Sequence, residues 1–355
     1  MDRLRLCFSE LRADVVLVTH LPNIFYLTGF SGSAGLLLIA PEKGLLLIDS
    51  RYTFQAREEV SRVRVETVKH GLLRGAGEAI SRVSRRGRVS VAYSPAQLTV
   101  AQKQALDAAT RGRVRWVPAS GLVERQRAIK DADELSRMQQ AADVISKTFC
   151  DVVPMIRPGI TELELAAEIE YRMKRLGASG ASFETIVASG ARSAWAHARP
   201  TAKPLKKNEL VVLDQGAILR AYCSDMTRTV FLGRSSEKVR RMYRAVLDAQ
   251  EAAKNVIRPG VAAEAPDAAA RRVFKKYGLA RFFTHSTGHG LGLEVHEAPR
   301  LGKGERATLE EGMVVTVEPG VYLEGFGGIR IEDDVVVTST GAQDLTSAPR
   351  ELLEL

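Results

Sequence analysis

The first third of the chain alternates short apolar runs with longer charged stretches. Runs rich in valine, leucine and isoleucine predict β-strands, because these side chains fit a pleated, buried surface. The longer stretches place apolar residues three or four positions apart and predict amphipathic helices. We therefore predict a separate α/β domain over residues 1–122, with strands at 15–18, 35–40, 45–49 and 89–92 and helices at 52–60 and 97–109.

A charged segment separates this domain from the rest of the chain. Residues 122–130 carry four charges and lead into a helical pattern that begins at Asp131. Such segments commonly connect domains, and a chain of 355 residues exceeds the size at which a single core usually stops growing. The sequence thus predicts a second domain over residues 123–355.

The second domain contains an internal repeat. The tetrapeptide Ile-Arg-Pro-Gly at 156–159 returns at 257–260, an offset of 101 residues. Two glycines that would end the following helices, Gly177 and Gly278, keep the same offset. The first helix also begins with the spacing of a capping box, Thr161 followed three residues later by glutamate. A match kept over a whole helix predicts two structurally related halves.

Each half also brings two carboxylates to the ends of apolar strands. Asp214 and Asp225 belong to the first half, and Glu318 and Glu332 belong to the second. Halves related by a pseudo-two-fold axis would converge these four acids on one place. Their mutual repulsion could be relieved only by protonation or by cations, so the pattern predicts a dinuclear metal site.

Histidines are concentrated next to these acids. Three of the six histidines, His285, His289 and His296, lie within twelve residues and are interleaved with glycines 288, 290 and 292. Glycine allows unusual backbone angles and close approach, as a strand bordering a metal centre requires. The segment is therefore a candidate source of metal ligands.

Composition narrows the classes of function. The chain is 45% hydrophobic and 26% charged, without a run that could span a bilayer, and residues 1–20 lack the continuous apolar core of a secretory signal. Three cysteines without CxxC spacing argue against a disulfide framework. The net charge of +9 is dispersed. We expect a cytoplasmic protein that binds neither nucleic acid nor membranes.

Five residues resemble, in order and spacing, the metal ligands of the pita-bread metallopeptidases (family M24), which include aminopeptidase P, prolidase and methionine aminopeptidase. These residues are Asp214, Asp225, His289, Glu318 and Glu332. The resemblance covers the whole chain. It implies a two-domain α/β chain, with an N-terminal creatinase-like domain and a catalytic domain of duplicated α+β halves about a pseudo-two-fold axis.

The resemblance also implies two divalent metal ions per subunit. Asp214 would bind one ion, and His289 with Glu318 the other, while Asp225 and Glu332 would bridge both. Oxygen-rich ligation with a single imidazole favours Mn²⁺ or Co²⁺ and tolerates Zn²⁺ or Fe²⁺. Two such ions would lower the pKa of a shared water, which is then the nucleophile.

Further roles follow from the same resemblance. Glu318 matches the proton shuttle between the attacking water and the leaving nitrogen. His197 and His296 match the histidines that hydrogen-bond the substrate and its tetrahedral intermediate. His285 would line the pocket that receives proline, and Arg330 would contact the substrate.

Two activities remain within the family. The run at 23–35 resembles aminopeptidase P, whereas Arg300 matches an arginine that binds the C-terminal carboxylate of dipeptides in some prolidases. We expect an Xaa-Pro aminopeptidase acting on short proline-containing peptides, with an Xaa-Pro dipeptidase as the alternative and a non-catalytic peptide-binding module as a remote one. The family also suggests a homodimer.

One departure from the family pattern lies at Arg220-Ala221, where many members have Asn-Gly. Asn-Gly favours a tight type I′ hairpin. The replacement therefore predicts a different or longer turn at this position, without a change in any ligand.

Overall fold

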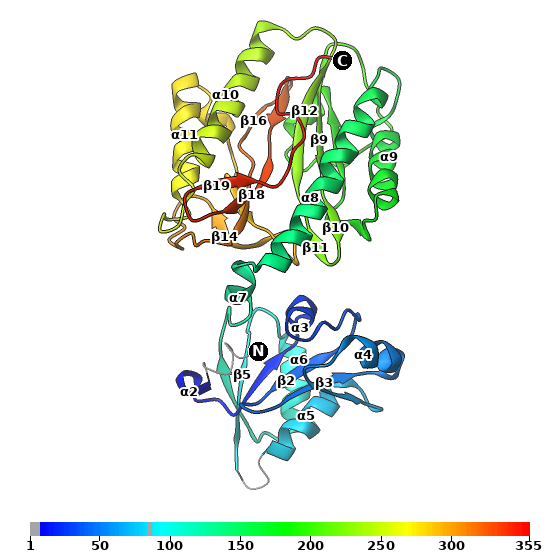
Figure 1. Cartoon of the computed structure of the whole chain (residues 1–355), viewed down its shortest axis with the longest axis vertical. Coiled ribbons are helices and arrows are strands. Elements are labelled where there is room, and N and C mark those ends of the chain that lie inside the picture. Colours follow the sequence, from blue (N-terminus) through cyan, green and yellow to red (C-terminus); the bar gives the residue numbers. More distant parts are fainter. Residues whose placement is uncertain (1–7, 84–86) are drawn as a thin grey trace. The chain divides into compact units, whose positions relative to one another are not determined.

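The computed structural model describes residues 8–83 and 87–355. The chain forms two compact units, one that ends at Arg127 and one that begins at Ala128 (Figure 1). The division lies within α7 (Glu124–Ala128), a few residues after the predicted boundary at residue 122. In the described part of the chain, no helix is long and apolar enough to cross a membrane.

The N-terminal unit is built on a six-stranded sheet in the order β4-β3-β2-β1-β5-β6. Strand β1 pairs antiparallel with β2 and parallel with β5, so the sheet is mixed. The four predicted strands are confirmed to within one residue at each end, whereas the hydrophobic pattern does not predict β4 and β6. The strands are β1 (Val15–Val18), β2 (Leu36–Ile39), β3 (Gly44–Ile48), β4 (Arg64–Thr67), β5 (Val89–Tyr93) and β6 (Val114–Pro118).

Helices of this unit include two that the hydrophobic pattern misses, α3 and α5. Helix α5 contains glycines, which disfavour a helix interior. A Cβ at Gly77 would lie only 2.4 Å from the Cβ of Ala109, so the packing of α5 on α6 requires this glycine. The helices are α2 (Phe8–Leu11), α3 (Leu21–Thr28), α4 (Thr53–Glu59), α5 (Leu72–Val83) and α6 (Val100–Ala109).

The second unit places its strands between two pairs of helices. In Figure 1, α10 and α11 lie on one side of the strands and α8 and α9 on the other, and each pair covers its own apolar core. The four helices are α8 (Ala132–Val152), α9 (Glu162–Arg175), α10 (Glu237–Lys254) and α11 (Ala265–Tyr277). The strands used below are β8 (Ile186–Ser189), β9 (Glu209–Gln215), β10 (Ala217–Leu219), β11 (Tyr222–Cys223), β12 (Met226–Leu232), β13 (Gly288–Gly290), β14 (Glu297–Leu301), β15 (Val314–Val317), β16 (Gly320–Leu323), β17 (Gly327–Arg330) and β18 (Asp333–Val337).

The predicted repeat is confirmed in the helices α9 and α11, which each follow one copy of the tetrapeptide. Helix α9 begins with the predicted capping box, in which Thr161 Oγ1 accepts a hydrogen bond from the Glu164 N–H at 3.1 Å. Its apolar face is fully buried, with Leu165, Ile169 and Met173 at 0% exposure. Each such side chain stabilises the fold by about 1.5–3 kcal/mol.

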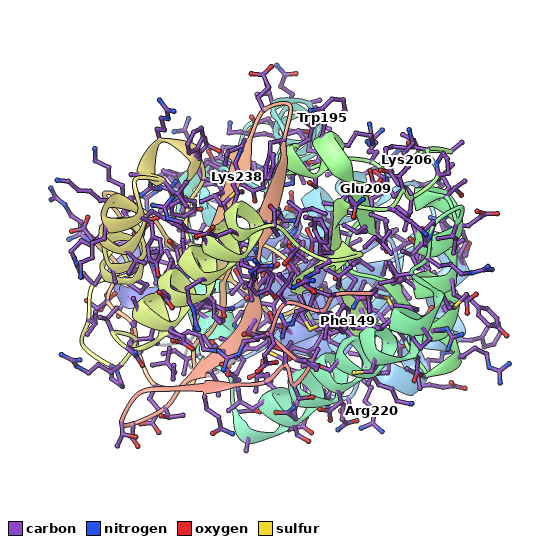
Figure 2. All side chains as sticks on the ribbon, turned by 90° about the horizontal axis from the view of Figure 1, so that it is seen from above. Phe149, Trp195, Lys206, Glu209, Arg220 and Lys238 are labelled. Carbon is purple, nitrogen blue, oxygen red and sulfur yellow. The ribbon has the colours of Figure 1, made fainter. Side chains whose placement is uncertain are left out.

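The prediction of a different turn at Arg220-Ala221 is wrong. Leu219 pairs with Tyr222, so only two residues connect β10 and β11. Arg220 has φ 50° and Ala221 has φ 73°, and positive φ at both central residues is what a type I′ turn requires. Arg220 is exposed at the outside of the unit (Figure 2). The paired strands impose the tight turn although neither residue favours it.

Replacing Ala221 with glycine should raise the free energy of unfolding by about 1 kcal/mol, because glycine adopts positive φ without a Cβ clash. Urea unfolding followed by circular dichroism measures the change. The control is Ala252→Gly within α10, where the same replacement should lower stability by about as much. A loss of stability in both variants would contradict the turn argument.

Candidate metal centre

Five segments of the second unit each deliver one side chain to a common place. Strands β9 and β12, which pair along their whole length, belong to the first half of the repeat, and β13, β15 and β18 belong to the second. The two halves therefore meet here, as the repeat predicts. The side chains are Asp214 in β9, Asp225 just before β12, His289 in β13, Glu318 just after β15, and Glu332 between β17 and β18.

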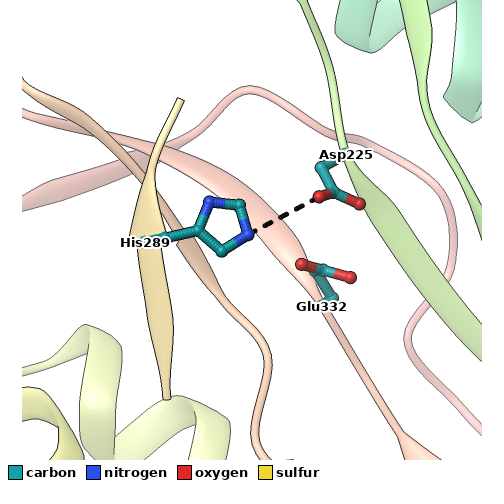
Figure 3. A group of neighbouring side chains, drawn as sticks. All are labelled: Asp225, His289 and Glu332. Carbon is teal, nitrogen blue, oxygen red and sulfur yellow. Dashed lines mark ion pairs between the residues drawn. The ribbon is translucent and has the colours of Figure 1, made fainter. Parts of the chain in front are cut away.

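The ligand-type atoms of these residues face one another. His289 Nε2 lies 3.8 Å from Asp225 Oδ2 and 3.7 Å from Glu318 Oε1. One ligand atom each from Asp225, His289 and Glu332 lie within 4.8 Å of one another, and Figure 3 shows the three side chains pointing into the same space from different segments. This spacing suits a cation held between them.

The carboxylates carry an electrostatic cost that a cation would remove. Burial raises the pKa of Glu318 to about 8. Burial, followed by the charge of Glu332, raises the pKa of Asp225 well above its ordinary value, and burial does the same to the pKa of Glu332. Oδ1 of Asp214 and Oδ1 of Asp225 are buried without a hydrogen-bond partner in the described residues. Such atoms are unfavourable unless a cation compensates them, so the donor set fits divalent metal ions.

His289 is prepared as a neutral ligand. Its Nδ1 lies 3.0 Å from the carbonyl oxygen of Gly290, which can only accept, so the ring proton is on Nδ1 and the lone pair of Nε2 faces the acids. Burial lowers the pKa of His289 to about 4, which keeps the ring neutral near pH 7. Metal binding requires this neutral form.

Arg330 donates hydrogen bonds to the acid cluster and to the residues beside it. Its Nη2 donates to Asp214 Oδ2 at 2.6 Å, its Nε donates to Thr227 Oγ1 at 2.9 Å, and its Nη1 donates to Tyr322 Oη at 2.8 Å. Thr227 Oγ1 in turn donates to Glu332 Oε2 at 2.6 Å. These contacts orient two of the carboxylates. The predicted contact of Arg330 with substrate stays a prediction, although the residue lines the cavity.

A cavity of about 670 Å³ opens over the acids. Its wall contains all ten residues that the sequence analysis selects as site residues, so the fold brings together the full predicted set. It also contains residues that the analysis does not select: Phe183, Glu184, Ile186, Ala196, Ala198, Arg199, Ser286 and Glu297.

The remaining histidines differ in their contacts. His285 Nε2 lies 2.9 Å from Tyr322 Oη and its Nδ1 lies 2.8 Å from the Ser286 carbonyl, so both ring nitrogens already have partners. Its contribution to the cavity is an apolar ring face. The ring of His296 stacks edge-on against His289 at 4.4 Å between centroids, and burial lowers the pKa of His296. His197 lines the cavity together with its neighbours in sequence.

Sequence reasoning misses the residues that support the carboxylates. Asp334 Oδ2 accepts the backbone N–H of Asp225 at 2.9 Å, and Thr227 contacts Glu332 as described. Residues two positions apart on a strand share one face. Thr227 follows Asp225 by two and Asp334 follows Glu332 by two, so polar residues at this spacing are the signal that could identify them.

Comparisons with known proteins match both units. Residues 136–339 match the family model for metallopeptidase family M24, and residues 1–129 match the creatinase/prolidase N-terminal domain. An Xaa-Pro dipeptidase of Pyrococcus horikoshii is 36% identical over 342 residues, which cover 96% of this chain and 94% of that protein.

Solved structures are similar over the full length. An Xaa-Pro dipeptidase from Bacillus anthracis has a TM-score of 0.95 and 37% identity, covering 99% of this chain and 98% of the other. An X-Pro aminopeptidase from Thermotoga maritima has a TM-score of 0.90 and 36% identity, covering 99% of each chain. The expected creatinase-like N-terminal domain and pita-bread catalytic domain are thereby confirmed.

Proposed function

Because this chain belongs to metallopeptidase family M24, we propose that it is a metal-dependent Xaa-Pro dipeptidase, which hydrolyses the bond between an N-terminal residue and proline in dipeptides. Xaa-Pro dipeptidases or prolidases predominate among the similar proteins and structures whose names state an activity on Xaa-Pro bonds. They support the dipeptidase alternative better than the aminopeptidase that the sequence analysis favours. Similarity to the Thermotoga enzyme keeps the aminopeptidase as the second candidate.

Two divalent ions would be held by the five converging residues. Asp214 would bind one ion, His289 and Glu318 the other, and Asp225 and Glu332 would bridge them. When bound, such a pair makes hydroxide available at neutral pH and polarises the scissile carbonyl. Oxygen-rich ligation favours Mn²⁺ or Co²⁺ over softer metals.

The remaining steps belong to side chains around the ions. Glu318 accepts a proton on its carboxylate from the attacking water and transfers it to the leaving proline nitrogen. His197 and His296 hydrogen-bond the substrate carbonyl and the oxyanion that forms from it. The ring of His285 packs against the proline.

The observation that carries the dipeptidase proposal is the place of Arg300. This exposed residue lines the cavity, and the one hydrogen bond described for its guanidinium is a long one, 3.3 Å from Nη2 to the Lys303 carbonyl. The other N–H groups can therefore bind an anion in the cavity. In an Xaa-Pro dipeptide the carboxyl group of proline is a free carboxylate, whereas in a longer peptide it forms a neutral amide. A guanidinium therefore favours the dipeptide.

Replacing Arg300 with alanine should raise KM for Xaa-Pro dipeptides by about ten- to a hundredfold, because a hydrogen bond to a charged group contributes roughly 1.5–3 kcal/mol. Steady-state kinetics with paired Xaa-Pro and Xaa-Pro-Yaa substrates provides the measurement. In the parent protein, the dipeptide should have the higher kcat/KM.

The matched control is Arg306→Ala, an exposed arginine in the connection that follows β14 and is absent from the cavity wall. It should leave both substrates unaffected. Faster cleavage of tripeptides than of dipeptides by the parent protein would overturn the dipeptidase proposal and favour the aminopeptidase. The cytoplasmic location and the homodimer stay predictions.

A further inference from the structure

One wall of the cavity is formed by an irregular segment between β8 and β9. Ala196, His197, Ala198 and Arg199 of this segment line the cavity. The segment contains one short 3₁₀ turn, and Trp195 at its outer side is 60% exposed (Figure 2). The later part of the segment is also held by the backbone, because the carbonyl oxygens of Thr201 and Lys203 accept from the N–H groups of Leu163 and Glu162, at 3.1 Å each. Residues 195–200 around His197 belong to no strand or bridge, so their position depends more on side-chain contacts.

A single carboxylate binds the chain on both sides of His197. Glu162, the first residue of α9, is 0% exposed. Its Oε1 accepts from the N–H and the hydroxyl of Ser189, at 2.9 and 2.8 Å, where the segment begins. Its Oε2 accepts from the N–H and the hydroxyl of Thr201, at 3.1 and 2.8 Å, four residues after His197. The Arg192 Nε also donates to Oε2, at 3.1 Å.

Arg192 connects the Glu162 carboxylate to further residues of the segment; we call Glu162 and its hydrogen-bond partners the clamp. Its Nη2 donates to the carbonyl oxygen of Arg199 at 2.5 Å, and its guanidinium lies 4.8 Å from the ring centroid of Trp195. On the inner side, the carbonyl oxygen of Ala196 accepts from Arg330 Nη1 at 3.2 Å. The residues on both sides of His197 are therefore tied either to the buried carboxylate of α9 or to the acid cluster.

We propose that Glu162 is a positioning residue that fixes His197 over the substrate. The inference rests on the proposed function, in which His197 binds the scissile carbonyl. A carboxylate suits this place because Oε1 accepts from Ser189, before His197, and Oε2 accepts from Thr201, after it. An amide of the same shape accepts on one side and turns an NH₂ group against donors on the other.

The second half of the repeat uses the same device. Asp267, in the first turn of α11, is 1% exposed and accepts from the N–H and hydroxyl of Thr287, at 3.2 and 3.0 Å. It also accepts from Arg271 Nε at 2.6 Å, and Arg271 Nη2 donates to the His285 carbonyl at 2.7 Å. A buried acid in the first turn of each repeat helix therefore holds a segment that carries a cavity histidine.

The test combines Glu162→Gln with a fluorescence signal inside the segment. The chain has two tryptophans, so a Trp116→Phe background leaves Trp195 as the single reporter. Acrylamide should quench Trp195 more strongly in Glu162→Gln, since the loosened segment exposes the ring. With Xaa-Pro dipeptides, kcat should fall about ten- to a hundredfold while KM changes by no more than a few-fold, as expected for a displaced catalytic group. Metal content should be unchanged.

Glu168→Gln on the same helix is the matched control. It removes a carboxylate–arginine pair of 2.7 Å with Arg172 and touches no part of the segment, so quenching and kcat should stay at the parent values. If Glu162→Gln does not fold, Thr201→Ala, which removes one bond at the far end, should show the same changes at smaller size.

The outcomes separate the two proposals. Unchanged Trp195 quenching in a folded Glu162→Gln protein overturns the positioning role, whatever peptide is cleaved. Equal loss of kcat in Glu162→Gln and Glu168→Gln also overturns it, because the effect is then general destabilisation. Stronger quenching in a protein whose parent cleaves no Xaa-Pro dipeptide supports the clamp and refutes the proposed function.

Discussion

Replacing Glu332 with glutamine, or Asp225 with asparagine, should abolish metal binding and peptide hydrolysis together, with residual activity below about a thousandth of the parent's because no metal-activated water remains. Each residue is almost fully buried, at 2% and 5% exposure, and one carboxylate oxygen of each lies within 4.8 Å of a ring nitrogen of His289. Elemental analysis after dialysis against Mn²⁺ and assay of the same samples measure both effects.

The same substitutions should not destabilise the metal-free protein. Replacing Glu332 with glutamine removes the cost of burying a carboxylate and its repulsion with the other acids. Metal-free Glu332→Gln should therefore melt no lower than the metal-free parent. Metal should raise the melting temperature of the parent but not of Glu332→Gln or Asp225→Asn. Glu324→Gln, an exposed acid between β16 and β17, is the control and should bind metal normally. Full hydrolysis by chelated parent protein would refute the metal centre itself.

Replacing His296 with alanine should lower kcat by about 10² to 10³ while metal content stays at the parent value, since an oxyanion donor contributes on this scale. The ring lies against the cluster, 4.4 Å from His289 between centroids, but it is not one of the five proposed ligands. Parallel metal analysis and steady-state kinetics measure the two quantities.

The control for this substitution is His70→Ala, an exposed histidine of the N-terminal unit that should change neither quantity. If His296→Ala loses metal as completely as Glu332→Gln does, the division between metal-holding and substrate-binding residues is wrong. A rise in KM alone, with kcat unchanged, would assign His296 to ground-state binding instead.

Local patterns account for the parts of the fold that the sequence predicts well. The apolar face of α9 follows from helical spacing, and its start follows from the capping box at Thr161. Helix α5 is missed because its glycines contradict helix propensity, and only the contact of Gly77 with α6 explains them. The tight turn at Ala221 is missed for the same kind of reason, since strand pairing overrides the preference of the turn residues.

The sequence by itself indicated the two related halves and the convergence of four acids, because a repeat kept along the chain records a repeated arrangement of strands and helices. The set of five candidate ligands and the roles of the histidines around them came from the resemblance to the M24 family. Only the tertiary structure decided what each charge pairs with. Arg330 meets Asp214 across 116 residues, and Glu162 holds Ser189 and Thr201 across 27 and 39. Hydrogen bonds and charges act over a few ångströms in space, and distance along the chain does not record which distant residues come that close.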